Sequence, residues 1–129
     1  MATGAPFLTF AQCEPHEARP WLLQAERKGR APGGEGIETI MARGQCFMLG
    51  LNDEPVAAYV LGVQGGEVFI LAAAGRADID LTAAIDQVVT FQADGFDSVA
   101  FFTIRPGLKK KTAALGYAQD GAVMRKRLK

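Results

Sequence analysis

Hydrophobic residues in this chain gather into strand-length runs in its middle and then into a helix-like repeat. The runs CFMLGL, VAAYVLGV and EVFILAAA follow one another closely between residues 46 and 74. The first two are separated by Asn52-Asp53-Glu54-Pro55, and the next two by Gln64-Gly65-Gly66-Glu67. Both connections are rich in turn formers, so the runs predict an antiparallel meander of three strands. Apolar residues at both parities indicate that helices cover both faces of the sheet.

The clearest predicted helix follows the meander. Its apolar stripe has the i, i+3, i+4, i+7, i+8 spacing of an amphipathic helix and consists of Leu81, Ala84, Ile85, Val88 and Val89. Asp80 is placed to cap this helix and Gly95 to end it. The next run, SVAFFTI at 98–104, predicts a buried strand, and the helical crossover makes it parallel to the preceding strand if the two are neighbours.

The N-terminal part predicts one strand and two helices. PFLTF at 6–10 alternates loosely and indicates a first strand. Glu14-Pro15 resembles a helix start, and Pro20 either kinks that helix or marks where its regular part begins. A loop-like segment, APGGEG at 31–36, then leads into a short helix over about residues 36–44.

The C-terminal part predicts a short basic helix and a final strand. Pro106 suits a first helical residue, and Gly116 suits a stop. A turn is expected at Gln119-Asp120-Gly121, followed by a strand through Val123 and Met124. Because side chains alternate along a strand, Arg125 and Arg127 should share one face while Lys126 takes the other.

Length and composition indicate one domain spanning residues 1–129, since 129 residues with 49% hydrophobic content are enough for a compact core. The sequence lacks an apolar run of membrane-spanning length and a signal-peptide pattern, so we expect a cytoplasmic protein without membrane association. Cys13, Cys46 and His16 do not have metal-ligand spacing, so no metal site is predicted. Buried free thiols are the favoured interpretation for the two cysteines, and a disulfide stays an alternative.

Charge is balanced overall but unevenly distributed. The chain has 14 basic and 14 acidic residues, yet from Arg105 onward eight Lys or Arg residues accompany a single acid, Asp120. The tail therefore carries a formal charge of +7 and the rest −7. This asymmetry suits either a polyanion-binding face or a solvated helix and edge strand. Aromatic residues do not interleave with the basic ones, which disfavours nucleic acid as a partner.

The order of these elements resembles the GNAT family of acyl-coenzyme A dependent N-acetyltransferases over nearly the whole chain. Leu115-Gly116-Tyr117 is similar to the Leu-Gly-Phe pattern that ends the family's last helix, and VMRKRL at 123–128 to the strand that follows. The resemblance implies an α/β (α+β) acyl-CoA N-acyltransferase fold. Such a fold has a mixed, mostly antiparallel central sheet of about seven strands with helices on both faces.

In that family the fourth strand and the helix after it hold acetyl-coenzyme A, with loop amides facing its pyrophosphate. The resemblance therefore implies cofactor contacts by residues at the end of the third meander run, with one cation after the following strand: Ala73, Ala74, Gly75, Arg76 and Arg105. The two glycine positions of the family's loop fall on Asp78 and Asp80. Their carboxylates would repel a pyrophosphate, so the cofactor loop is degenerate.

Family members often use a carboxylate near the fourth strand and a tyrosine in the last helix for catalysis. Glu67 is the candidate catalytic base, acting through water if its surroundings raise its pKa. Thr112 occupies the tyrosine position and is a poor acid. Tyr59 and Tyr117 are able to donate to a ligand, although both suit packing better.

Three functions remain as alternatives at this stage. The first is an N-acetyltransferase that acts on a small-molecule or protein amine. The second is a non-catalytic scaffold, similar to the acetyltransferase-like virion proteins of some tailed bacteriophages. The third is polyanion binding through the basic tail. Formation of a homodimer is left open.

Overall fold

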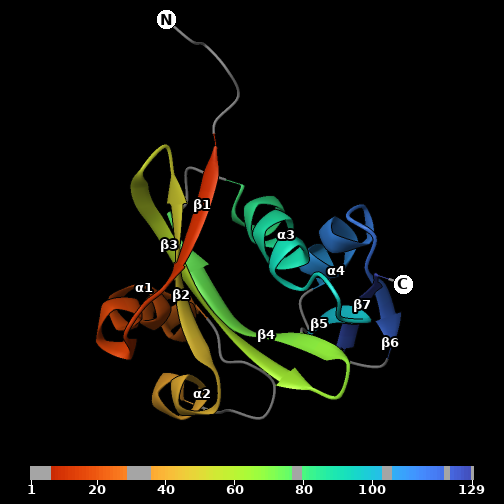
Figure 1. Ribbon diagram of the computed structural model, residues 1–129, viewed down its shortest axis with the longest axis horizontal. Coiled ribbons are helices and arrows are strands. Elements are labelled where there is room, and N and C mark those ends of the chain that lie inside the picture. The colour runs from red at the N-terminus through yellow and green to blue at the C-terminus, as the bar shows by residue number, and fades with distance from the viewer. Residues whose placement is uncertain (1–6, 29–35, 77–79, 103–105, 121–122, 129) are drawn as a thin grey trace, which may run out of the picture.

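A computed structural model describes residues 7–28, 36–76, 80–102, 106–120 and 123–128. Its strands are β1 (Leu8–Gln12), β2 (Gln45–Leu51), β3 (Glu54–Gln64), β4 (Glu67–Gly75), β5 (Ser98–Phe102), β6 (Ala118–Asp120) and β7 (Val123–Arg127). Its helices are α1 (Pro15–Lys28), α2 (Ile37–Arg43), α3 (Leu81–Gln92) and α4 (Pro106–Ala113). Figure 1 shows how these elements are arranged around the sheet.

The strands form one seven-stranded sheet in the order β1-β2-β3-β4-β5-β7-β6. Each neighbouring pair is antiparallel except β4 and β5, which are parallel as the helical crossover predicted. Helices lie on both faces, and two hydrophobic cores separate along these faces. One core joins α1 and α2 to the sheet, and the other joins α3 to the opposite face. The predicted mixed sheet with helices on both faces is confirmed.

The turns of the meander are tighter than the sequence suggested. Only Asn52 and Asp53 lie between β2 and β3, because Glu54 and Pro55 already belong to β3. Asn52 and Asp53 have φ of 51° and 70°, as a type I′ hairpin requires, and these residue types tolerate that conformation best after glycine. The predicted four-residue connection is therefore wrong in length but correct in chemistry.

The first helix resolves the question raised by Pro20. α1 begins at Pro15 and continues through Pro20, so the helix does not start there. The backbone N–H of Glu14 donates to Oε1 of Glu17 over 2.9 Å, which satisfies a donor at the helix entrance. Ala18 and Leu22 share the buried face, and both are fully enclosed. That face fixes α1 against the sheet.

The final turn differs from the prediction. Gln119 and Asp120 belong to β6, a short strand paired with β7, so the turn does not begin at these residues. Its expected third member, Gly121, lies outside the described residues. Gly116, between α4 and β6, has φ of 102°, a left-handed conformation that glycine adopts readily after a helix.

The cysteines lie close together but are free thiols. The backbone N–H of Cys13, just after β1, donates to the carbonyl of Cys46, near the start of β2, over 2.9 Å. Burial and the neighbouring Cys46 raise the pKa of the Cys13 thiol to about 11. The favoured interpretation as buried free thiols is confirmed for Cys46, whereas Cys13 is free but only half-buried. Thiols with a raised pKa react slowly near neutral pH.

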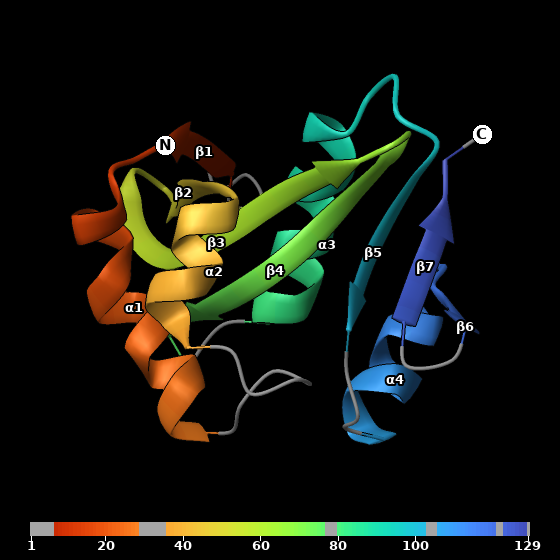
Figure 2. The same ribbon diagram turned by 90° about the horizontal axis from the view of Figure 1, so that it is seen from below.

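The parallel pair β4–β5 separates part-way along its length. Paired residues run from Glu67–Ser98 to Phe69–Ala100, after which β4 continues to Gly75 with no strand partner on this side among the described residues. The register of β4 against β3 also shifts by one residue at Leu71, which indicates a β-bulge. A bulge bends its strand and increases the local twist. Figure 2 shows β4 and β5 diverging from their joined end.

Candidate functional site

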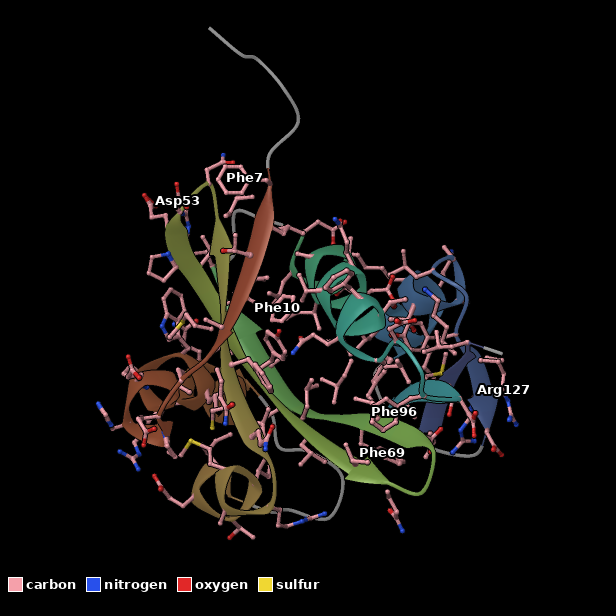
Figure 3. All side chains as sticks on the ribbon, viewed as in Figure 1. Phe7, Phe10, Asp53, Phe69, Phe96 and Arg127 are labelled. Carbon is pink, nitrogen blue, oxygen red and sulfur yellow. The ribbon has the colours of Figure 1, made fainter. Side chains whose placement is uncertain are left out.

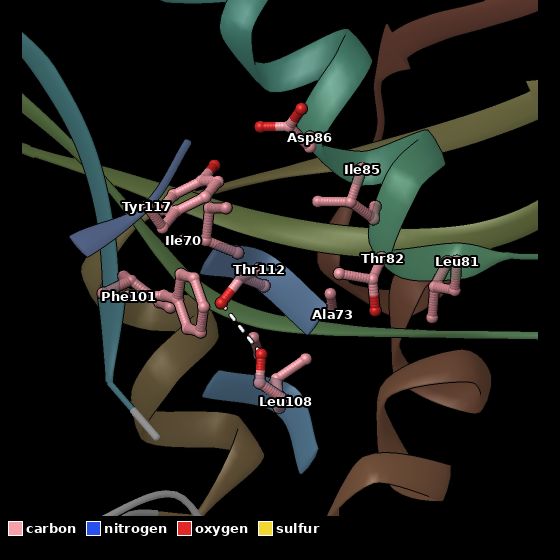
Figure 4. A pocket seen from close by; sticks show the side chains of 12 residues that line it. Ile70, Ala73, Leu81, Thr82, Ile85, Asp86, Phe101, Leu108, Thr112 and Tyr117 are labelled. Atoms are coloured by element: carbon pink, nitrogen blue, oxygen red, sulfur yellow. Dashed lines mark hydrogen bonds between the residues drawn. The ribbon is translucent and has the colours of Figure 1, made fainter. Parts of the chain in front are cut away.

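A cavity of about 230 Å³ lies where β4 and β5 separate, closed on further sides by α3 and α4 (Figure 4). Its apolar walls come from the diverging strands and the two helices: Ile70, Ala73, Leu81, Ile85, Phe101 and Leu108. Polar groups are few and come from Thr82, Asp86, Thr112 and Tyr117. A mostly apolar cavity with a few convergent polar groups is the usual form of a small-molecule site.

The unpaired edge of β4 forms one wall of this cavity. Along that edge the backbone N–H and C=O groups of a strand normally need a partner, and a bound ligand can supply it. Ala73, a predicted cofactor contact, lines the cavity. Ala74 points to the other face, where it is buried in the core beneath α1 and α2. Gly75 lies against Ala57, where a side chain would not fit.

The N-terminal end of α3 is capped by its own chain. Asp80 accepts a hydrogen bond from the backbone N–H of Ala83 over 3.2 Å, which confirms the predicted N-cap. Lys111 Nζ, from α4, lies 2.8 Å from the same carboxylate. The hydrogen bond from Lys111, followed by that from Ala83, lowers the pKa of Asp80. Asp80 is therefore an anion at the place where a helix would otherwise attract one.

One cavity-lining residue, Asp86, belongs to a charged pair that the sequence did not predict. Lys126 Nζ, from β7, lies 3.3 and 3.4 Å from the two carboxylate oxygens of Asp86 on α3. The same ammonium lies 5.8 Å from the ring centroid of Tyr117. Asp86 and Thr82 stand one helical turn apart beside the apolar stripe of α3. That position was the available signal for Asp86, although it gave no indication of its partner.

Glu67 lies at the joined end of β4 and β5 and is not among the residues that line the cavity. Its carboxylate accepts hydrogen bonds from the Arg125 guanidinium and, over 2.7 Å, from the Ser98 hydroxyl. The hydrogen bond from Arg125 has the largest effect and lowers the pKa of Glu67. The raised pKa on which its role as a general base depended is thus not found. This ion pair joins β4, β5 and β7, while the catalytic role stays a prediction.

Thr112 lines the cavity at the position expected for the family's tyrosine. Its hydroxyl donates to the backbone carbonyl of Leu108 over 2.8 Å, and the side chain is 2% exposed. A hydroxyl whose proton is donated to the preceding turn of α4 is not available to a ligand as a donor. The loss of an acid at this position is therefore not compensated by Thr112.

Of the two arginines expected near the cofactor, Arg76 and Arg105, the structure describes only Arg76. Arg76 lies directly after β4, and its Nη1 donates to Oε1 of Glu54 over 3.1 Å. Its side chain is exposed, so the ion pair is accessible to solvent. Arg105 and Asp78 lie outside the described residues. Their predicted contacts stay predictions.

The uneven charge along the chain is partly balanced by contacts within the fold. Three residues of the basic tail reach acids on distant elements: Lys111 reaches Asp80, Lys126 reaches Asp86, and Arg125 reaches Glu67. Arg125 also binds the tail's own acid, Asp120. Arg127 points outward at the edge of the sheet (Figure 3). The predicted alternation is confirmed, because Arg125 and Lys126 bind acids on opposite faces.

Comparison with known proteins identifies the fold. The sequence matches no protein-family profile and no curated protein. The structure is similar to an IAA acetyltransferase from Bacillus cereus ATCC 14579, with a TM-score of 0.68 and 12% identity over 95% of this chain and 100% of the other. The chain has the GNAT acetyltransferase fold.

Other GNAT-fold structures agree. A GNAT family acetyltransferase from Elizabethkingia anophelis with acetyl-CoA bound gives a TM-score of 0.66 and 13% identity, over 94% of this chain and 98% of the other. The ribosomal-protein-S18-alanine N-acetyltransferase from Escherichia coli gives 0.63 and 14%, over 95% and 94%. At such identities the likeness concerns the fold, and the chemistry has to be argued from the cavity itself.

Proposed function

We propose that this protein binds an acyl-coenzyme A and transfers the acyl group to an amine. The observation that supports the proposal is the cavity between the diverging strands, with its apolar walls and the unpaired edge of β4. Similar folds have been solved with acetyl-CoA or coenzyme A bound. An extended, amide-containing arm fits such a cavity, because strand-edge backbone groups pair with amides while apolar walls contact methylenes.

The part of the site near α3 suits the cofactor's phosphates less well. The Asp80 carboxylate occupies the helix N-terminus and is held there by Lys111 and the N–H of Ala83. A phosphate arriving there meets a fixed negative charge, and it gains Lys111 only if the existing ion pair opens. We therefore propose a weakly bound acyl-coenzyme A, with Lys111 as the residue that would contact its phosphates.

Calorimetric titration with acetyl-coenzyme A tests the proposal. We expect saturable binding to the wild-type protein and its loss in Ala73→Phe, which places a ring in the cavity. Val63→Phe is the matched control, because Val63 is 63% exposed on β3 and does not line this cavity. Thiol release in the presence of primary amines then reports transfer. No binding by the wild type at millimolar cofactor would contradict the proposal.

A second candidate function, a non-catalytic scaffold, is supported by the same features that weaken the case for acyl transfer. The filled N-terminus of α3 and the committed hydroxyl of Thr112 suit a protein that keeps the fold as a scaffold. Such a scaffold would resemble the acetyltransferase-like proteins of phage particles. Co-sedimentation with a large assembly, together with no cofactor binding, would favour this function over acyl transfer.

A further inference from the structure

The phenol hydroxyl of Tyr117 is the buried polar side-chain atom that lacks a hydrogen-bond partner in the described part of the chain. The Tyr117 side chain is 4% exposed and lines the cavity between β4 and β5. In Figure 4 the hydroxyl end of the ring is directed to the side of the cavity where Asp86 lies. A buried hydroxyl without a partner destabilises a fold. A ligand in the cavity can remove that penalty.

The ring that carries this hydroxyl is held in place from two sides. Phe101 packs edge-on against it, with ring centroids 5.3 Å apart at an interplanar angle of 69°. Lys126 Nζ stands 5.8 Å from the centroid, within the range of a cation–π contact. These contacts keep the hydroxyl from turning away to solvent, so its direction is fixed before a ligand arrives.

The charges around the hydroxyl determine which ligand group suits it. Asp86 is neutralised by Lys126, which bonds both of its carboxylate oxygens. The part of the cavity beside Asp86 and Tyr117 therefore attracts neither anions nor cations strongly. Burial, followed by the charge of Asp86 and by its closeness as a hydrogen-bond acceptor, raises the pKa of Tyr117, so the phenol keeps its proton at neutral pH. The hydroxyl and the carboxylate do not meet with the geometry of a hydrogen bond, so the donor stays free for a ligand. A protonated phenol in a neutral, apolar corner suits an uncharged acceptor.

We propose that the Tyr117 hydroxyl donates a hydrogen bond to a carbonyl oxygen of the ligand that occupies this cavity. The inference rests on the proposed function, in which the ligand is an acyl-coenzyme A. That molecule offers two sources of such a carbonyl, the acyl thioester and the amides of its extended arm. Tyr117 is therefore a ligand-binding residue, whereas Thr112 in the same cavity already donates to Leu108.

Tyr117→Phe tests the inference with two ligands, acetyl-coenzyme A and coenzyme A without the acyl group. We expect acetyl-coenzyme A to bind roughly tenfold more weakly, as the loss of one buried hydrogen bond predicts. Weakening of acetyl-coenzyme A alone assigns the thioester carbonyl, and equal weakening of both assigns an amide of the arm. Unchanged affinity for both ligands would overturn the inference.

Thermal unfolding without ligand supplies an independent readout. Tyr117→Phe removes an unpaired hydroxyl, so Tm should stay the same or rise. Tyr59→Phe is the matched control, because Tyr59 is equally buried but its hydroxyl donates to Gln92 and it does not line the cavity. This control should lower Tm and leave ligand affinity unchanged.

The outcomes separate the inference from the proposed function. A lower Tm for Tyr117→Phe in the absence of ligand would show that the hydroxyl has a protein partner, and would overturn the inference alone. Wild-type protein that binds neither ligand would contradict the proposed function and the inference with it. Wild-type binding that Tyr117→Phe does not weaken would contradict only the inference.

Discussion

The ammonium of Lys111 in α4 lies 2.8 Å from Oδ1 of Asp80, the residue that caps α3. Both side chains are at least half exposed, so the pair adds little to stability. Its importance lies in its position, since Leu81 and Leu108, near the two partners in sequence, line the cavity between the strands. The pair joins a carboxylate that would repel a phosphate to a cation that would attract it.

Asp80→Asn should strengthen the binding of coenzyme A. Asparagine caps a helix as well as aspartate does, so α3 should remain intact while a negative charge is removed and Lys111 is released. We expect affinity to rise by roughly five- to tenfold at low salt, with a smaller gain at high salt because the effect is electrostatic. Calorimetry at two ionic strengths measures both.

The control for this experiment is Asp80→Ala, which also removes the charge but loses the cap. It should reduce the free energy of unfolding by about 1 kcal/mol, whereas Asp80→Asn should not. If Asp80→Asn binds coenzyme A no better than the wild type, the carboxylate is not what limits phosphate binding at α3.

Glu67→Gln should destabilise the protein at neutral pH and flatten its acid denaturation. The carboxylate is 16% exposed and paired with Arg125, so losing its charge leaves the guanidinium poorly paired, at a cost of about 2 kcal/mol. The pKa of Glu67 is lowered in the folded state. Its stabilisation is therefore present above its unfolded pKa of about 4.3 and is lost as pH falls through the folded value. Urea denaturation between about pH 3 and pH 7 measures both effects.

The same variant separates two roles for Glu67. If the carboxylate is the general base, Glu67→Gln should abolish acyl transfer even under conditions where the variant is fully folded. If its role is to join β4, β5 and β7, transfer should persist in the folded fraction. Equal stability of the variant and the wild type at every pH would refute the structural role.

Gly75→Ala should destabilise the protein whether or not a cofactor is present. A Cβ at this position would lie 2.5 Å from Cβ of Ala57 and 2.6 Å from the carbonyl oxygen of Val56. Because the second of these atoms is backbone, β3 and β4 would have to move apart, at a cost of about 1–3 kcal/mol. Chemical denaturation without ligand measures this. A stable variant that has lost only cofactor binding would show that the glycine serves the ligand instead.

The fold was predictable because its elements are locally consistent. Asp80 caps α3 where the apolar stripe begins, and the crossover through that helix requires β5 to be parallel to β4. The bulge at Leu71 was not predictable in this way. Apolar residues of β4 point to both faces of the sheet. A one-residue shift in its register against β3 therefore does not change the alternation of apolar and polar residues. The cavity depends on that bend and on the early end of pairing at Phe69.

The candidate site was harder to predict from the sequence because its polar groups come from distant parts of the chain. Asp86 and Lys126 are 40 residues apart, and Glu67 and Arg125 are 58 apart. The charge imbalance between the tail and the rest was visible, but pairing these charges requires the sheet order. Glu67 was chosen for its place at the start of a strand, which turned out to be the joined end of the pair. The sequence leaves Tyr117 open to packing or to donation to a ligand, and its surroundings in the fold reveal the unpaired hydroxyl.

Lys126→Met should destabilise the protein more than an ordinary surface substitution. It leaves the Asp86 carboxylate, 14% exposed, without its cation and with the hydrogen bond from Thr90, at a cost of about 2–3 kcal/mol. Adding Asp86→Leu should recover most of this loss, because two apolar side chains then fill the inner end of the cavity. Lys110→Met, at an exposed position on the neighbouring helix, should change the free energy of unfolding by no more than about 0.5 kcal/mol. Urea denaturation of the wild type and the three variants measures this recovery, and a double variant less stable than Lys126→Met would show that the charges do not act as a pair.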